Sequence, residues 1–406
     1  MKCLNRSLVS FELLNRKSLL VTGFLLLILS VNTILGSNIP ASADTVKTKK
    51  PEAIDLTSFS DGINHALMVY KDKKAPYERY SPEEIDKIAE NLLLWQNKDG
   101  GWPKNIDWLK KYSGIEKEEI LQRDKNDSKS RSTFDNRNIY SQIDYLVKVY
   151  HQTGTEIFAE SALRGINYIL ESQNISGGWR GADVDAITFN DDVMTGILQL
   201  LNRILKNRNT YPFIDDSTFF KINLAFEKGI DCILRCQITV DGRLTAWCQQ
   251  HSNVDYKPVW ARAFEPPSIA SSESVSVVRL LMEIEHPSEE VIRSVKSAVQ
   301  WMDKVKINGI RIENVAAEPI SFNYHYSDFD RVIVKDEKAP PIWSRYYDLV
   351  LEDPIFCTRE KVITRNYTDL SRERRTGYAW FSYAPAALIH TDFVKWSGKI
   401  AKLQKQ

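Results

Sequence analysis

Apolar residues recur every three or four positions along most of this chain, a spacing that predicts amphipathic helices. The stretch 81–84, Ser-Pro-Glu-Glu, has the composition of a capping box with proline at the first helical position, and periodic apolar residues follow from Ile85 to Leu93. The same periodicity predicts further helices at 136–152, 156–173, 193–205, 217–237, 272–283 and 289–305.

Three of the predicted helices end in related sequences. Gln96, Gln173 and Gln237 stand at these ends, 77 and 64 residues apart, and Gly-Gly-Trp comes shortly after the first two. The third copy is degenerate and keeps an Asp-Gly pair at 241–242. A repeat of this length holds two helices, and such a hairpin buries one face by stacking on its neighbours. The pattern therefore predicts an all-α dominated fold, an α/α toroid of helical hairpins.

The C-terminal part of the chain has a different pattern. Residues 311–312, 324–326 and 331–334 favour short strands or loops. No stretch rich in Gly, Ser or Pro divides the chain after its N-terminal segment. We therefore expect one catalytic domain over 81–406 with an irregular, partly β C-terminal portion, preceded by a lead-in at 44–80.

Residues 1–43 have the composition of a secretory signal peptide. Basic residues occur up to Lys17, an almost wholly apolar run follows, and Ala41-Ser42-Ala43 is a small-x-small cleavage pattern. We expect the mature chain to start near Asp44, to be extracellular or periplasmic, and to have no stable membrane association. The alternative is a retained anchor, because the apolar run nearly reaches the roughly 18 residues that a membrane span needs.

Composition limits the kinds of partner. The 406-residue chain has 26% charged residues and a formal net charge of +1, so no global field would attract nucleic acid, and an anionic ligand needs local positive charge. We expect a monomer. One or two disulfides are possible in an oxidising compartment, but the sequence does not assign them. The cysteines that remain after signal removal are Cys232, Cys236, Cys248 and Cys357.

Two predicted helix starts carry adjacent acidic and amide residues, each beside a phenylalanine. Asp135 and Asn136 precede one helix, and Asn190 and Asp191 precede another. Such residues are ordinary N-caps, which is the first interpretation. The second is a cation site: in a toroid the two corners would face the same rim, and their oxygens suit a hard cation such as Ca²⁺.

The segment 244–274 is the other candidate region. It has no helical or strand period, and it contains two tryptophans, a histidine, a pair of glutamines and Arg262, which shortly precedes Glu-Pro-Pro. This composition fits either a packed connection between helices or an ordered loop that carries function on a rigid scaffold.

Six short sequence motifs are informative as a set. They are DGGWPKNID (99–107), STFDN (132–136), ITFNDD (187–192), TAWCQQH (245–251), ARAFEPPS (261–268) and RRTGYAW (374–380). As a set, in this order over roughly residues 88–388, they resemble polysaccharide lyase family 10, the pectate lyases. The resemblance implies a toroid with a central groove that cleaves polygalacturonate, an acidic polysaccharide, by β-elimination with Ca²⁺.

The resemblance also implies roles for individual residues. Arg262 would be the base that takes the C5 proton of a uronic acid, and Asp135 and Asp191 would bind calcium. Arginine stays protonated in most proteins, so Lys104 is the alternative base, although we expect it to bind a carboxylate. The further expected substrate contacts are Asn136, Asn190, Arg345, Arg359 and Arg375.

Alternatives remain for these residues and for the protein. Each arginine could be a surface or ion-paired residue, and Arg374 or Arg375 could pair structurally with Glu373. The loop 180–186 is shorter and differently charged than is usual in the family, which favours an inactive or altered relative that binds acidic polysaccharide. Another toroid enzyme, such as a terpene cyclase, shares the Gln-Gly-Gly-Trp element, but 183–186 lacks its D-x-D-D motif.

Overall fold

The computed structural model describes residues 51–70, 73–124, 127 and 129–404. The expected signal peptide lies outside this part of the chain. The described residues form one compact unit. None of the helices in the described ranges combines the length and the apolar composition needed to cross a bilayer. The four described cysteines are buried and free, so neither disulfide that the sequence left open is formed among them.

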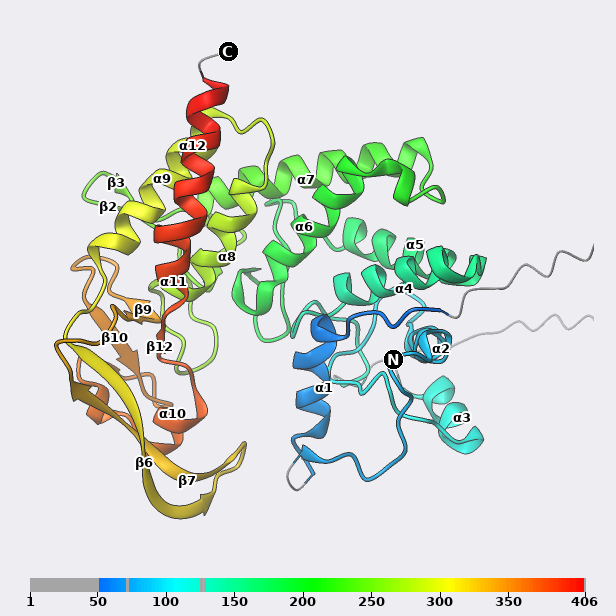
Figure 1. Cartoon of the computed structure of the whole chain (residues 1–406), viewed down its shortest axis with the longest axis horizontal. Coiled ribbons are helices and arrows are strands. Elements are labelled where there is room, and N and C mark those ends of the chain that lie inside the picture. The colour runs from blue at the N-terminus through cyan, green and yellow to red at the C-terminus, as the bar shows by residue number, and fades with distance from the viewer. Residues whose placement is uncertain (1–50, 71–72, 125–126, 128, 405–406) are drawn as a thin grey trace, which may run out of the picture. The chain divides into compact units, whose positions relative to one another are not determined.

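Helices predominate up to residue 304 (Figure 1). They confirm the apolar periodicity, with ends that differ from the predicted ones by a few residues. The helix predicted after the capping-box stretch begins only at Ile85, since Ser81 and Glu84 form a turn in which the Ser81 N–H donates to the Glu84 carboxylate at 2.8 Å. The helices are α1 (Ser60–Leu67), α2 (Ile85–Trp95), α3 (Gly114–Gln122), α4 (Tyr140–Thr153), α5 (Glu156–Glu171), α6 (Val193–Lys206), α7 (Asp216–Cys236), α8 (Ser271–Met282), α9 (Glu289–Lys304), α10 (Arg372–Gly377), α11 (Ala384–Ala387) and α12 (Phe393–Leu403).

The strands are mostly short. The exception is the hairpin of β6 and β7, which confirms the strands predicted there and pairs Arg311 with Val334 and Ile312 with Ile333. The strands are β1 (Ile187–Thr188), β2 (Thr239–Val240), β3 (Arg243–Leu244), β4 (Gln250–His251), β5 (Ile269–Ala270), β6 (Ile310–Ser321), β7 (Tyr326–Lys335), β8 (Trp343–Ser344), β9 (Tyr346–Tyr347), β10 (Pro354–Cys357), β11 (Ile363–Thr364) and β12 (Phe381–Ser382).

The predicted fold class, an all-α dominated α/α toroid, is wrong. The described residues form a mixed fold with several small sheets, and these are not confined to the C-terminal portion: β1 pairs with β4, and β5 joins β9, β10 and β11. Periodicity missed these strands because a two-residue strand has no measurable period. Its pairing partner is also remote in sequence, as in the pairing of Ile187 with His251.

The repeated glutamines connect successive helices. Gln96, Gln173 and Gln237 follow α2, α5 and α7, and each side-chain amide donates to a carbonyl oxygen in the next helix of the series, in α5, α7 and α9 respectively, at 2.9–3.1 Å. The indole N–H groups of Trp102, Trp179 and Trp247 donate back to the helices that precede them at 2.7–2.8 Å. The residues of the repeat thus join the end of each helix to the next helix through hydrogen bonds.

The first glycine of each Gly-Gly pair has a specific geometric role. Gly100 and Gly177 have φ angles of +89° and +87°. A Cβ at these positions would lie 2.2 Å from the carbonyl oxygen of Arg164 and 2.4 Å from that of Lys228. Only glycine fits both the backbone conformation and the close approach of the next helix. These glycines lie in turns a few residues after the helix ends.

Candidate active site

Two strained corners of the chain carry the acidic motifs. One precedes α4 and the other is a short 3₁₀ helix that precedes α6. Each has two consecutive non-glycine residues with positive φ: Asn136 (55°) and Arg137 (61°), and Asp191 (53°) and Asp192 (56°). Such conformations cost on the order of 1 kcal/mol or more each and persist where the surrounding structure imposes them. Backbone strain is therefore present at both predicted corners.

The structure brings the carboxylates of Asp135 and Asp191 together. Burial, followed by the charge of Asp135, raises the pKa of Asp191 well above its usual value. Lys104 forms an ion pair with Asp135 through its Nζ. Asn190 donates to Asp191 Oδ2 at 3.1 Å. Asp135 thus has a direct cationic partner, and Asp191 accepts a hydrogen bond from the side-chain amide of Asn190.

Asp191 lines an open hollow of about 370 Å³ between the two corners and the start of α8. Arg345, Glu273 and Asn190 line the same hollow. So does Asp61 of α1, a helix in the segment expected as a lead-in. The lead-in therefore contributes a carboxylate to the candidate site.

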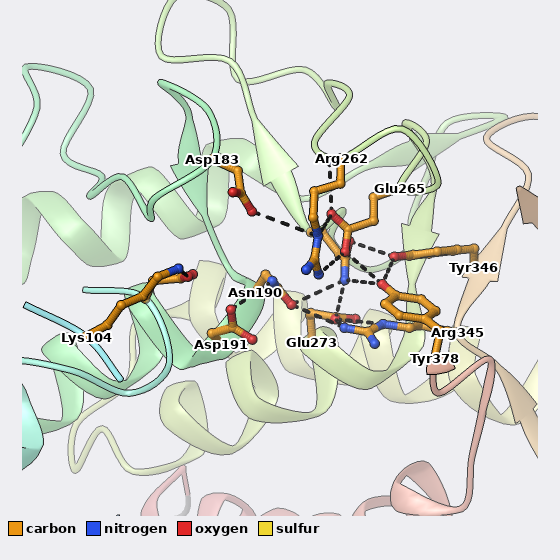
Figure 2. A network of polar contacts seen from close by, with 12 residues as sticks. Lys104, Asp183, Asn190, Asp191, Arg262, Glu265, Glu273, Arg345, Tyr346 and Tyr378 are labelled. Carbon is orange, nitrogen blue, oxygen red and sulfur yellow. Dashed lines mark hydrogen bonds and ion pairs between the residues drawn. The ribbon is translucent and has the colours of Figure 1, made fainter. Parts of the chain in front are cut away.

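Arg262 is held by a bidentate ion pair. Its Nε and Nη2 donate to the Glu265 carboxylate at 2.9 and 2.5 Å, while Asp183 lies 3.9 Å from its Nε (Figure 2). Glu265 is 2% exposed and also accepts from the Tyr378 hydroxyl at 2.9 Å. Burial alone would lower the pKa of Arg262, but the hydrogen bonds and charge of Glu265 outweigh it and raise that pKa. The guanidinium is therefore stabilised in its protonated form.

Arg345 is the second arginine of the candidate site and contacts the acidic corner at Asn190. Its guanidinium donates to Glu273 at 2.5 and 3.1 Å and to the Asn190 Oδ1 at 3.2 Å, and it lies 4.5 Å from the centre of the Tyr378 ring. Burial opposes its charge, but Glu273 raises the pKa of Arg345 well above the usual value. Figure 2 shows Lys104 on one side of Asn190 and Asp191, with Arg262 and Arg345 on the other.

The remaining predicted contacts are more dispersed. Asn136 donates to the Asn105 side chain at 2.7 Å, beside the Asp135 corner. Arg359 pairs with Glu373 at 2.7 and 3.0 Å and lies over the ring of Phe264, two residues from Arg262. Arg359 thus lies in the vicinity of Arg262.

Arg374 and Arg375 have different partners. Arg374 also pairs with Glu373, in the structural ion pair considered from the sequence. Arg375 instead pairs with Asp330 of β7 at 2.6 and 2.9 Å. Its contacts tie α10 to the long hairpin, and none of them is to a residue of the acidic corners.

Several residues that contact or link Arg262 and Arg345 were not predicted individually. Glu265 and Glu273 hold the two arginines, and Gln249, Tyr346 and Tyr378 link them through hydrogen bonds. Glu265 lies within the ARAFEPPS string, three residues after Arg262, so its spacing could have suggested the pair. Glu273 and Arg345 are far apart in sequence, and no local pattern joins them.

The pairing of β1 with β4 positions the second acidic corner, and His251 fixes β4. The ring Nε2 accepts from the Cys248 N–H at 2.9 Å, and Nδ1 lies 2.7 Å from the carbonyl oxygen of Tyr256. A neutral ring protonated at Nδ1 satisfies both contacts. Burial lowers the pKa of His251 to about 4 from a value of 6.5 for the exposed group.

Acid should destabilise the protein through His251. Because the unfolded chain takes up a proton near pH 6.5 and the folded ring only near pH 4, this stabilisation is present above pH 6.5 and lost as the pH falls to 4. The loss is about 3 kcal/mol of unfolding free energy. Urea unfolding across this range should show it in the wild type and in the control His286→Gln, an exposed position. Equal pH dependence in His251→Gln and wild type would contradict the assignment.

Comparisons with known proteins identify the family and the fold. A family model described as pectic acid lyase matches residues 96–389. A solved structure of a family 10 polysaccharide lyase from Cellvibrio cellulosa has 24% sequence identity, covers 86% of this chain and 99% of its own, and superposes with a TM-score of 0.63. A mutant family 10 lyase from that organism, in complex with trigalacturonic acid, has the same identity and TM-score and covers 85% and 99%. No curated protein matches the chain.

The family match and the shared fold define an enzyme, a polysaccharide lyase. The chain belongs to the pectic acid lyase family, since the family model matches well over half of it. The resemblance to family 10 is thus confirmed, and the terpene cyclase alternative is excluded. At 24% identity the two solved structures establish the shared fold.

Proposed function

We propose that the protein is a secreted, monomeric pectate lyase that cleaves α-1,4-linked polygalacturonate by calcium-assisted β-elimination, releasing unsaturated oligogalacturonides. The observation that carries the proposal is the adjacent pair of carboxylates, Asp135 and Asp191, with the positive charge of Arg262 near enough to act on Asp191. Two neighbouring acids and a nearby arginine suit an acidic sugar bound partly through a cation. The solved relative that is in complex with trigalacturonic acid supports this substrate class.

The residues present fit calcium as a cation shared with substrate. The raised pKa of Asp191 reports a buried like-charge pair, which a cation would relieve. Among the described residues no group of three His, Cys, Asp or Glu side chains could hold a metal alone. Calcium takes about six to eight oxygens, so water and a substrate carboxylate would have to complete the set. Bound there, calcium would neutralise the uronate carboxylate and make the C5 proton more acidic.

The elimination needs a base beside C5. Removal of the C5 proton leaves an electron pair that forms the C4–C5 double bond, while the C4–oxygen bond breaks and the leaving oxygen takes a proton from water. Arg262 is our proposed base. Its ion pair with Glu265 works against this role because it stabilises the protonated guanidinium. The role requires Arg262 to separate from Glu265, or to pass it a proton, when substrate enters.

The other cationic groups would bind sugar carboxylates. Lys104 and Arg359 keep about a third of their side-chain surface exposed, 30% and 37%, so they can reach a ligand. Arg345 is 15% exposed and holds Asn190, which suits a residue that positions the corner and contacts substrate at the floor of the hollow. The ion pair of Arg375 with Asp330 favours a structural role over its predicted substrate contact.

Incubation with polygalacturonate and calcium should produce ultraviolet absorbance from a double bond conjugated with the carboxylate. A chelator should abolish the signal because Asp135 and Asp191 would then lack their cation. Absence of the signal with calcium present would refute lyase activity on this polymer, and a signal that survives chelation would refute the metal role. The alternative, an inactive relative that binds acidic polysaccharide, would retain the polymer in affinity electrophoresis without producing the absorbance.

Export is proposed from the N-terminal sequence. The basic start, apolar run and Ala-Ser-Ala motif favour cleavage after Ala43. N-terminal sequencing of the exported protein should give a start near Asp44, and a product that begins at Met1 would contradict signal cleavage.

A further inference from the structure

A second hollow, of about 520 Å³, lies away from the acidic corners. It is bounded by the turn between β2 and β3, by one face of α9 and by the loop that contains Glu352. β2 and β3 lie beside the helix in Figure 1. This hollow shares no lining residue with the one at Asp191, and nothing in the proposed cleavage reaction uses it.

Positive charge is concentrated in this second hollow. Arg243, Arg293 and Lys304 line it together with a single carboxylate, Glu352. Lys304 contacts Glu352 directly, and Arg243 lies 3.5 Å from the same carboxylate oxygen. Arg293 is exposed and has no ion-pair or hydrogen-bond partner among the described residues. Three cations against one anion leave a local excess of positive charge in a chain whose net charge is only +1.

The spacing of these groups along α9 suits an extended ligand. Arg293, Ser297, Gln300 and Lys304 are at positions i, i+4, i+7 and i+11, so they form one stripe on the helix. At about 1.5 Å of rise per residue, the two cations are roughly 16 Å apart along the axis. Hydroxyl and amide groups lie between them. A linear chain with repeated carboxylates and hydroxyls matches this arrangement better than one small anion.

A buried donor on the same wall lacks an acceptor. Trp301, which lines the hollow and is 3% exposed, has an indole N–H with no hydrogen-bond partner in the described part of the chain. Glu352 also has one buried carboxylate oxygen without a partner there. Buried polar groups are rarely left unpaired, so the residues that line this hollow retain unused hydrogen-bonding capacity.

We propose that this hollow is a second binding site for acidic polysaccharide, separate from the cleavage site. The proposal rests on the proposed function for the identity of the polymer, a carboxylate-bearing glycan such as polygalacturonate. If one polysaccharide molecule binds at both sites, or if two neighbouring polysaccharide molecules bind one at each site, the effective substrate concentration at the acidic corners rises. The second site should therefore increase the affinity for long polymers and leave the affinity for a trisaccharide unchanged.

The test compares charge reversals on one helix. Arg293→Glu removes the unpaired cation of the hollow, and Lys296→Glu makes the same charge change at an exposed α9 position that does not line it. In affinity electrophoresis with chelator, Arg293→Glu should bind polygalacturonate about tenfold more weakly, as expected for loss of a charge-assisted contact. With calcium, KM for the polymer should rise by a similar factor. Turnover of trigalacturonate should stay unchanged, and Lys296→Glu should match the wild type throughout.

The outcomes separate the binding site from the lyase activity. If both variants behave alike in electrophoresis, the second site is refuted, whether or not the wild type cleaves. If Arg293→Glu alone loses retention while the wild type forms no unsaturated product, the site stands and the lyase proposal fails. Inorganic phosphate serves as the small-anion probe. If Arg293→Glu loses phosphate binding but keeps polymer retention, the hollow binds small anions only and the proposal is overturned.

Discussion

Replacing Arg262 by alanine is expected to lower kcat on polygalacturonate by about 10²–10⁴-fold, the range lost when a base is removed. KM should change much less, because Lys104, Arg345 and Arg359 would still bind substrate carboxylates. The measurement is the initial rate of double-bond formation at several polymer concentrations. Arg262→Lys should also lose kcat, since a lysine keeps the charge but not the position of the guanidinium.

The control for this experiment is Arg359→Ala, since Arg359 also pairs with a glutamate and lies over Phe264. It should raise KM and leave kcat nearly unchanged. Arg262→Ala leaves the buried Glu265 carboxylate without its cation, so Arg262→Ala with Glu265→Gln should be measured beside it to separate lost stability from lost chemistry. If Arg262→Ala keeps kcat within about tenfold of wild type, Arg262 is not the base. Lys104→Ala then tests the alternative.

Asp191→Asn is expected to make the calcium-free protein more stable and the enzyme inactive. Because folding raises the pKa of Asp191, the calcium-free protein loses stability as the pH rises from 3.8 through that raised pKa. Asparagine removes the like charge beside Asp135 and should add about 1 kcal/mol or more to the unfolding free energy at neutral pH. Calcium should no longer raise the melting temperature, and activity should fall at least about 100-fold, because a calcium ligand is lost.

Asp185→Asn provides the matched control, because Asp185 is an exposed aspartate of the loop 180–186. Its stability should stay within about 0.5 kcal/mol of wild type, and calcium should still stabilise it. Thermal unfolding with calcium and with chelator measures both effects. A calcium response that persists in Asp191→Asn would remove this carboxylate from the metal site, and a less stable calcium-free variant would contradict the inferred repulsion.

The helices could be predicted because burial imposes a period on the sequence. From Glu156 to Glu171 apolar residues repeat at the spacing of one helix face, and α5 spans that segment. The Gln-Gly-Gly-Trp repeat was also visible, since each element needs its own residue type: the amide spans two helices and the glycine accepts a φ of +89° or +87°. A fourth tryptophan, Trp343, makes the same contact with the end of α9 without this local signature.

The candidate site could be predicted only in part. The acidic corners and Arg262 were found because their motifs are local and resemble a family. The ion-pair partners of the arginines were harder to find: Glu273 lies 72 positions from Arg345, and Asp183 lies far before Arg262 in the sequence. Pairs at this separation follow from how the elements pack, and no spacing rule predicts them from one sequence.

The sequence by itself determined the helices, the repeat that joins their ends, and the residue types on which calcium binding and elimination would depend. Local propensity and side-chain chemistry depend on a few neighbouring residues, so they can be recognised from the sequence alone. The tertiary structure decided the mixed fold class, because strands as short as β1 and β4 form only where remote segments meet. It also decided that Arg345 pairs with Glu273 and that a second cationic hollow lies along α9, because both depend on packing between distant parts of the chain.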